Sequence, residues 1–363
     1  MGGVEFFDIM KKVVWLQPEH MPGWDAFVEK HPLGLIYHLS GWKKVLENTF
    51  NHIRGHFLAI EDDKSGEIIA GIPIYTVKSR LTGNRLVSIP FATLCDPLIS
   101  SPNDMKMIWS AIVELFEKLG GSYIEMRTWR FNSLKNNPNF PTLSRYKHHY
   151  LILDRRPDDI KKLFNRNCRR NILKALESPL KLKIASTENE LRDFYSLFLQ
   201  TRKKLSLPPI PYKFFQALWQ VFFSKGNVTL LIAQHRGRSI AALLILKFKN
   251  LVVGEAIGEC AEYRKYRSSY FLFWNVITLS CKEGYGKYSF GRTSQINKGL
   301  LSFKRNWGTV EETLSDIFYP QEICQKMEKR EFSWKYNAVK KIAERTPNSL
   351  FHMLGDIVYR HMG

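Results

Sequence analysis

The sequence is poor in cysteine, and none of its cysteines has a close partner. It has five, an odd number spread along the chain without a CxxC pair: Cys95, Cys168, Cys260, Cys281 and Cys324. We therefore expect neither a disulfide framework nor a cysteine-ligated zinc site, and this usage favours a cytoplasmic protein. The histidines lack ligand spacing too, because Gly55 and the strand-like residues after it argue against a helix that would pair His52 with His56. We expect no metal and no disulfide partner.

Long hydrophobic runs are also missing. Apolar stretches such as 241–246 are far shorter than the roughly 20 residues that cross a bilayer as a helix. Near the N-terminus, Glu5 and Asp8 interrupt the apolar residues and no small-residue cleavage site follows, so we expect no signal peptide.

Acidic residues are scarce relative to basic ones. The chain has 54 Lys and Arg against 34 Asp and Glu, which gives a formal net charge of +20. This excess favours an anionic partner, but charge alone does not choose among nucleic acid, a phosphorylated cofactor, a lipid-linked phosphate and an anionic membrane surface. The composition is otherwise that of a globular protein, with 44% hydrophobic residues. A length of 363 residues exceeds one typical core and predicts two domains.

Helices and strands are predicted in the same order in both halves of the chain. In the first half we expect strands at 13–16, 56–61, 67–77, 86–91, 123–127 and 148–153, helices at 22–30, 40–50 and 104–119, and a loop at 131–141. In the second half we expect helices at 158–177, 187–204, 212–223 and 268–283, and strands at 181–185, 228–234, 239–247, 251–256, 287–291 and 309–319. The shared order predicts a duplicated α/β unit with mixed sheets. The expected domains are 1–153 and 154–320, with a basic helical tail at 321–363 and a site in the cleft between the domains.

Residues 284–308 combine aromatic side chains with positive charge. The pattern predicts a strand that ends at Gly291, a polar turn, and a short helix with Leu300, Phe303 and Trp307 on one face. Lysines and an arginine surround that face. Two interpretations stay open here: a solvated loop with a docking helix, or the wall of a site in which Lys304 is held beside a buried aromatic ring.

Three segments resemble the Fem-type, tandem GNAT-fold acyltransferases, particularly relatives from bacterial exopolysaccharide clusters. They are GIPIYTVKSRLTGNRLVSIPF (71–91), FNRNCRRNILKAL (164–176) and YSFGRTSQINKGLLSFKRNWG (288–308). The last is similar to that group's F-G-R followed by G-x-x-x-F-K-x-x-W-G, and the resemblance covers residues 35–320. It implies two tandem GNAT-like domains and the transfer of an acyl or aminoacyl group to an amine.

The resemblance also implies residue roles near residue 300. Phe303 and Lys304 match the family's F-K pair, whose lysine is thought to lie by the reacting carbonyl and to stabilise developing negative charge there. The alternative for Lys304 is a helix lysine whose ammonium reaches out to solvent. Arg292, Asn297 and Trp307 are the further candidates for contacts with the substrate.

A second implied site is the donor loop at 263–269, which leads into the helix containing Trp274. In this fold, backbone amides where a strand leads into a helix hold the donor's pyrophosphate. The family's glycine-rich cradle is absent here, so the positive charge would have to come from side chains of a loop that is equally consistent with a solvated basic turn. The candidates are Arg264, Lys265, Arg267, Ser268 and Ser269. We expect acyl-CoA as the donor, with aminoacyl-tRNA as the alternative.

The acceptor predicted from the resemblance is a small-molecule or lipid-linked amine of a cell-envelope or exopolysaccharide precursor. Leu46 and Ile210 stand where the peptidoglycan enzymes of the family have a lysine and an arginine, which argues against a peptidoglycan precursor. The basic helix at 162–176 suits RNA phosphate, but such helices are often only solvated, so we do not favour a tRNA role. A non-catalytic binder of an anionic glycan-lipid or nucleic acid is the remaining alternative. The tail permits docking at the inner membrane surface, although a packed helix pair is the simpler interpretation.

Overall fold

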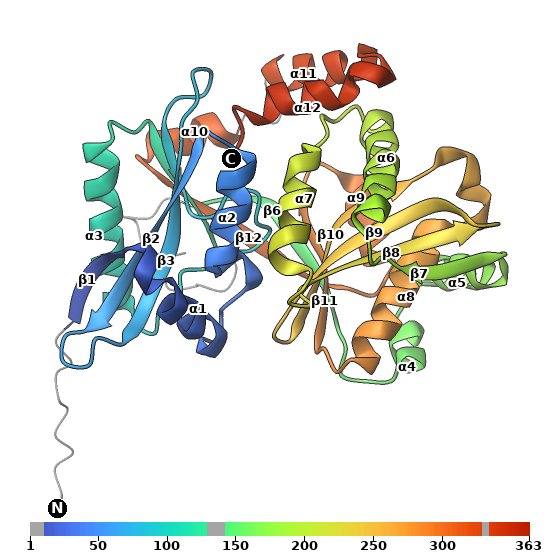
Figure 1. Ribbon diagram of the computed structural model, residues 1–363, viewed down its shortest axis with the longest axis horizontal. Coiled ribbons are helices and arrows are strands. Elements are labelled where there is room, and N and C mark those ends of the chain that lie inside the picture. The colour runs from blue at the N-terminus through green and yellow to red at the C-terminus, as the bar shows by residue number, and fades with distance from the viewer. Residues whose placement is uncertain (1–10, 129–141, 329–333) are drawn as a thin grey trace, which may run out of the picture.

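The computed structural model describes residues 11–128, 142–328 and 334–363, so the predicted loop at 131–141 lies outside the described residues (Figure 1). Twelve strands form one continuous sheet in the order β1-β2-β3-β4-β5-β12-β6-β11-β10-β9-β8-β7. The mixed α/β architecture predicted from the sequence is confirmed.

Two units with the same order of elements make up most of this sheet. The first consists of β1 (Lys11–Leu16), α1 (Met21–Lys30), α2 (Ser40–Thr49), β2 (Ile53–Asp62), β3 (Ile68–Val77), β4 (Arg85–Val87), α3 (Pro102–Lys118) and β5 (Tyr123–Thr128). The second consists of β7 (Leu180–Ile184), α6 (Glu188–Lys204), α7 (Tyr212–Phe222), β8 (Val228–His235), β9 (Arg238–Phe248), β10 (Leu251–Glu259), α8 (Ser268–Lys282) and β11 (Lys287–Ser294). The predicted duplication is thus visible element by element.

Two strands join the units at the centre of the sheet. β6 (Thr142–Ile152) follows the first unit but pairs with β11 of the second, and β12 (Val310–Tyr319) follows the second unit but pairs with β5 of the first. β6 and β12 also pair with each other. The domain boundary at 153 and 154 stays a prediction, because the sheet runs without a break across it.

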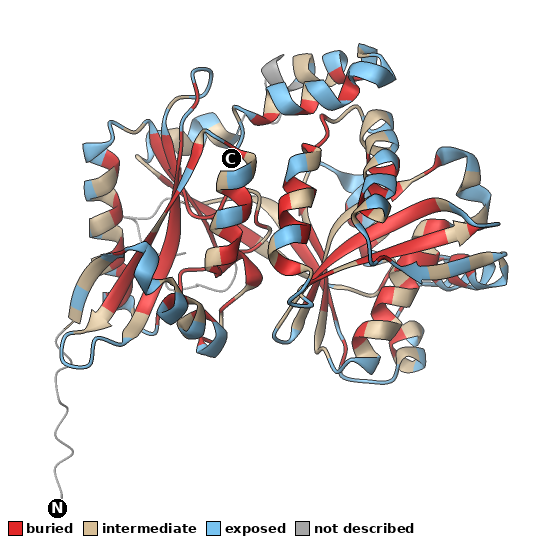
Figure 2. Cartoon of the chain, in the orientation of Figure 1, coloured by how far each residue is buried: buried red, intermediate tan, exposed pale blue. Residues whose placement is uncertain are grey.

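Helices cover both faces of the sheet. On one face α1 and α2 of the first unit and α6 and α7 of the second share one hydrophobic core, in which Trp42 and Phe214 lie edge to face at 6.0 Å. On the other face α3 covers the first unit and α8 the second, each over a core of its own. Figure 2 shows the buried strands running between these helical layers. Burial of this apolar surface is the main term that holds the two units together.

The predicted helix at 158–177 is in fact two helices, α4 (Pro157–Lys162) and α5 (Arg166–Glu177). Asn165 separates them because its side chain accepts a hydrogen bond from the backbone N–H of Cys168 at 2.7 Å and so caps the second helix. Phe164, in the same break, is fully enclosed in the core under α8. The sequence pattern did not reveal this turn because basic and apolar residues continue in helical spacing through it.

The buried face of α9 (Lys298–Arg305) also differs from the prediction. Leu301 and Lys304 face inward, whereas Leu300 is 39% exposed and Trp307 lies beyond the end of the helix. The helix begins at Lys298 because the side chain of Asn297 accepts from the N–H of Leu300 and caps it. This capped start sets the rotation of the short helix, so the predicted apolar face is displaced by one residue.

The tail is helical, as predicted, with α10 (Glu322–Glu328), α11 (Trp334–Arg345) and α12 (Phe351–Tyr359). It packs on the rest of the chain: the ammonium of Lys203 at the end of α6 donates to the carbonyls of Ala343 and Glu344 at 2.9 and 2.8 Å. Beyond α12, the chain reaches the first unit, where His52 Nε2 lies 2.7 Å from the carbonyl oxygen of Met362. Throughout the described residues, every helix is too short or too polar to span a membrane.

Candidate active site

The site begins where β10 and β11 separate. These two strands pair in parallel only from Leu251–Lys287 to Val253–Ser289. The register of β10 with β9 then shifts between Gly254 and Ala256, which leaves Glu255 as the extra residue of a bulge. On the opposite side β11 shifts its register with β6 and turns through Gly291, whose φ is +73°. A bulge beside a positive-φ glycine aims side chains and backbone groups away from the ladder, an arrangement frequent next to active sites.

Glu255 is the acid at this divergence. Its carboxylate oxygen accepts a hydrogen bond at 3.2 Å from the hydroxyl of Tyr37, which lies in the 3-10 turn η2 (Ile36–His38) of the first unit. Burial raises the pKa of Glu255 from 4.5 to about 7, although the bond from Tyr37 and the charge of Arg292 oppose that rise. Glu255 still keeps part of its surface exposed. A carboxylate in this state can exchange a proton near neutral pH.

Tyr37 brings the first unit into the site of the second. Its side chain is almost fully buried, and that burial raises the pKa of the phenol well above its usual value, so it stays a hydrogen-bond donor. The side chain of Thr93, also from the first unit, hydrogen-bonds to Tyr37. Residues of the two halves therefore contact each other directly here, while a site in a cleft between the domains stays a prediction.

Arg292 follows Gly291 on β11 and links Glu255 to a buried cluster of charges. Its guanidinium lies over the ring of Tyr146 at 4.7 Å. Burial raises the pKa values of Glu255, Cys95 and Asp316, and the charge of Arg292 opposes that rise in each. The predicted contact of Arg292 with substrate stays a prediction, but the structure does place this side chain beside the candidate acid.

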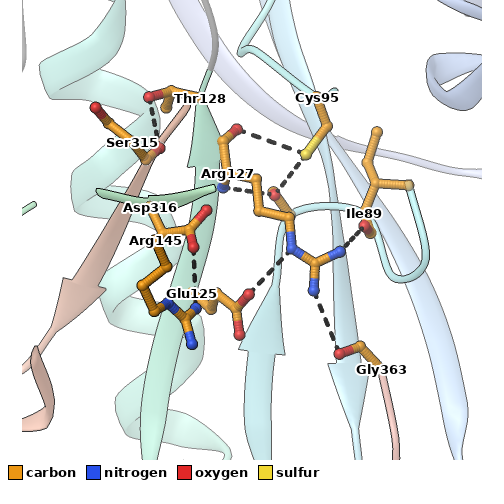
Figure 3. Close-up of polar contacts among 10 residues, drawn as sticks. Ile89, Cys95, Glu125, Arg127, Thr128, Arg145, Ser315, Asp316 and Gly363 are labelled. Atoms are coloured by element: carbon orange, nitrogen blue, oxygen red, sulfur yellow. Dashed lines mark hydrogen bonds and ion pairs between the residues drawn. The ribbon is translucent and has the colours of Figure 1, made fainter. Parts of the chain in front are cut away.

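The neighbouring cluster is made of two ion pairs at the join of the units (Figure 3). Arg127 Nε lies 3.0 Å from Glu125, and Arg145 Nη2 lies 2.9 Å from Asp316. Arg127 also donates to the carbonyls of Ile89 at 3.0 Å and Gly363 at 3.4 Å. Most donors of this buried network are paired, although Nε of Arg145 has no partner among the described residues, and its ion pairs link β5, β6 and β12.

The corresponding place in the first unit is closed. There β4 and β5 pair in parallel up to Val87 and Glu125, as β10 and β11 do up to Val253 and Ser289. Two residues further on, β5 has Arg127 where β11 has Gly291. The guanidinium of Arg127 bonds to Ile89, the residue equivalent to Glu255, and so bridges the divergence. Only the second unit offers, within the described residues, a diverging strand pair without such a bridge.

Lys304, predicted to act at the reacting carbonyl, lies immediately behind this divergence. Its ammonium donates to the carbonyl oxygens of Gly291 at 2.9 Å and Arg292 at 3.3 Å. Burial lowers the pKa of Lys304 to about 7, and the side chain is only 5% exposed, so it does not reach out to solvent. The structure shows Lys304 holding the turn of β11, while a direct catalytic role stays a prediction.

The aromatic residues predicted with Lys304 are packing residues in the structure. Trp307 is fully buried and stacks on Tyr270 at 5.5 Å, and it has no exposed surface with which to meet a substrate. Phe303 is partly buried against Tyr270 and Phe273, at 5.8 and 5.9 Å. Asn297 is committed to capping α9. These three side chains thus serve packing and capping around α9.

The predicted donor loop forms the 3-10 turn η4 (Ala261–Tyr266) and the start of α8. Arg264, Lys265 and Arg267 are exposed, and Arg267, with a φ of +56°, makes a left-handed turn without a glycine. Ser268 is fully buried, and its hydroxyl has no hydrogen-bond partner among the described residues. Ser269 bonds instead to Glu259, whose pKa is raised by burial. The loop thus keeps its cations at a helix N-terminus.

Sequence reasoning missed Glu255 and Tyr37. An acid in the otherwise apolar strand LVVGEAIGE was the available signal for Glu255, since a carboxylate seldom enters a buried strand without a role. Tyr37 carried no comparable signal, because its partner lies 218 residues away in the chain.

Comparison with known proteins supports this architecture. The acetyltransferase (GNAT) domain model matches residues 162–305, which contain β10, α8, β11 and Lys304. The structure of FemX superposes with a TM-score of 0.71 at 13% identity, covering 87% of this chain and 100% of FemX. L-PGS from Bacillus licheniformis gives 0.57 at 13% identity, covering 96% of this chain and 97% of its own. A tandem GNAT protein from the clavulanic acid biosynthesis pathway gives 0.55 at 10% identity, covering 85% and 97%.

No protein of curated function matches the chain in sequence. The identities to the solved structures are low, so those structures show the shared tandem fold, while the domain match covers the unit that contains the diverging strands. Residues 162–305 thus match the GNAT acetyltransferase domain, and the chain as a whole has the tandem fold of these solved structures.

Proposed function

We propose that the chain is an N-acyltransferase that transfers an acyl group from acyl-CoA to an amine of a cell-envelope or exopolysaccharide precursor. The observation that carries the proposal is Glu255, a partly exposed acid with a pKa of about 7, at the bulge where β10 leaves β11. A general base works best when its pKa lies near the operating pH, because it is then both ionised and basic enough to take a proton.

The chemistry needs few groups. The amine nitrogen attacks the thioester carbonyl carbon, the C–N bond forms, the C–S bond breaks, and the sulfur leaves as a thiolate that takes up a proton from solvent. Glu255 takes the proton that the nitrogen loses, and Tyr37 holds the carboxylate in place through its hydroxyl. Backbone amides at the bulge of β10 are suited to bond the oxygen that becomes negative, and Lys304 keeps the facing strand in position.

The start of α8 is the proposed site for the donor's phosphates. The N-terminus of a helix attracts anions, and Arg264, Lys265 and Arg267 add positive charge around it. The buried hydroxyl of Ser268 is a further polar group at this end. The acceptor class is supported by the resemblance of 71–91 and 288–308 to the exopolysaccharide-cluster proteins and by the net charge of +20, which suits a phosphate-bearing precursor.

A ligand-binding comparison tests the donor. Acyl-CoA or CoA, at 100 times its dissociation constant, should stabilise the native protein by about 2.7 kcal/mol, measured as a rise in melting temperature. A matched variant with Arg264→Gln and Lys265→Gln should need more CoA for the same rise. Salt-sensitive binding of tRNA without any response to CoA would favour the aminoacyl-tRNA donor instead. Failure of both ligands, together with no acyl transfer to any amine, would refute the enzymatic proposal.

A further inference from the structure

Helix α5 presents an outer face that the proposed chemistry does not use. Its inner face buries Cys168, Asn171, Ile172 and Ala175 against the second unit. The opposite side is exposed at the edge of the molecule, beyond α8 in the view of Figure 2. At 3.6 residues per turn, Arg166, Arg170 and Leu173 fall on that exposed side.

The exposed side is strongly cationic. Residues 161–177 contain one exposed acid, Glu177, and six basic residues: Lys161, Lys162, Arg166, Arg169, Arg170 and Lys174. Lys162 pairs with Asp159, but Arg166, Arg169, Arg170 and Lys174 form no ion pair with any residue that the structure describes. Arg169 and Arg170 bond only to a carbonyl and an amide oxygen of their own segment, which do not neutralise them. This charge is therefore available to an external anion.

Exposed leucines are mixed with these cations. Leu173 is 52% exposed and Leu176 is 44% exposed, and Leu163, in the turn before α5, is 50% exposed. Single apolar side chains on a surface need no explanation, but three within one basic segment form a pattern. A surface that binds only phosphate, such as an RNA site, has no use for the leucines. An anionic bilayer uses both groups, since leucines enter the boundary of the acyl chains while cations meet the phosphates.

We propose that the outer face of α5, defined by Arg166, Arg169, Arg170, Leu173, Lys174 and Leu176 together with Leu163 in the turn before the helix, docks on an anionic phospholipid surface. α5 packs against α8, where Phe164 meets Trp274 at 6.1 Å. Docking would therefore bring the second unit, with its diverging strands, to the membrane surface, where a lipid-linked acceptor resides. The binding itself does not depend on which donor the site uses.

The exposed stripe of α12 is the rival surface. Leu350, Met353 and Ile357 are half exposed there, at 51, 49 and 56%. This stripe also carries the exposed acid Asp356 and has fewer cations around it than α5. It is therefore the matched control, with similar apolar exposure but less positive charge.

Co-sedimentation of the full chain with vesicles tests the proposal. The protein should bind vesicles of phosphatidylcholine and phosphatidylglycerol in a 3:1 ratio, and leave those of phosphatidylcholine alone in solution. Arg166→Gln with Arg170→Gln should lower the partition coefficient about 30-fold, at about fivefold for each cation. Leu173→Gln with Leu176→Gln should lower it about tenfold, through lost insertion of apolar groups. Met353→Gln with Ile357→Gln on α12, and Lys78→Gln with Arg80→Gln on the first unit, should change it less than twofold.

Three results would overturn the proposal. One is equal binding of the wild type to both kinds of vesicle, or to neither. A second is unchanged binding by the leucine pair while the α12 pair loses it. The third is binding of purified tRNA that the arginine pair abolishes and the leucine pair leaves intact, without any vesicle binding. All substituted side chains are exposed, so the variants should melt within about 2 °C of the wild type, a control that separates docking from folding.

Discussion

Replacing Glu255 with glutamine should make the protein more stable and less active at the same time. The substitution keeps the shape of the side chain and an oxygen that can accept the hydrogen bond from Tyr37, but it removes the charge. In the folded chain the pKa of Glu255 is raised from 4.5 to about 7, so between these values the folded state holds a proton that the unfolded state has lost. The free energy of unfolding therefore falls as pH rises through this window and stays low above it.

The pKa difference sets the size of the effect. A rise from 4.5 to about 7 corresponds to at most about 3 kcal/mol of stability lost above pH 7. At pH 8 the Glu255→Gln variant should recover part of this, whereas at pH 4 it should match the wild type. Urea unfolding at the two pH values measures the difference, because the slope of the transition is not expected to change.

Activity should move in the opposite direction. Loss of a general base costs typically about 100- to 10,000-fold in rate. In the wild type, kcat/KM should rise with pH to a plateau above about 7, since the base must be ionised. In Glu255→Gln this pH-dependent rise of kcat/KM should be absent. Release of CoA thiol with a suitable amine gives the rate. Glu259→Gln is the matched control, since Glu259 lies on the same strand, has a raised pKa and bonds to Ser269 instead. A Glu255→Gln variant with wild-type rate and an unchanged pH profile would refute the reasoning.

Four other substitutions, at three positions, test the support of the site. Tyr37→Phe removes the only described hydrogen-bond donor to Glu255, so the pKa of Glu255 should rise further. The rise of kcat/KM with pH should therefore move to higher pH, by a fraction of a pH unit or more. Lys304→Met should lower kcat without changing CoA binding, because the turn of β11 loses its support. A lysine with a lowered pKa makes the folded protein more stable as pH rises from 7 to 10, and this rise, measured by thermal melting, should disappear in the variant. Gly291→Arg, which copies Arg127 of the first unit, should abolish transfer by bridging the strands, whereas Gly291→Ala should cost about 1 kcal/mol of stability through its φ of +73°. Transfer by Gly291→Arg at the wild-type rate would contradict the open divergence.

The elements of the fold were predictable because their apolar periodicity is local. The three consecutive strands β8, β9 and β10 and the helix α8 agree with the pattern within a few residues. Where a single side chain decides, periodicity fails. The cap at Asn165 broke a helix that looked continuous, and the cap at Asn297 turned Leu301 inward in place of Leu300.

The candidate site was predictable only in part, for a physical reason. The resemblance pointed to β11 and Lys304, and the structure puts both at the divergence of the strands. The acid and its partner, Glu255 and Tyr37, come from different units and meet only after the sheet has formed. The residue pattern within one strand does not reveal which residue of the other unit it will contact in the folded protein.

The exchange of β6 and β12 has a consequence for how the chain can be made. Thr128 of β5 bonds to Ser315, 187 residues later, so during synthesis β5 remains an open strand edge until nearly the whole second unit has left the ribosome. Unpaired edges are sites where chains associate wrongly, and pairings that span so many residues form slowly. The two units therefore cannot fold one after the other as independent domains. The edge of the first unit is completed only by β12, which follows the second unit, so a chain cut before β12 would leave β5 and β6 without their shared partner.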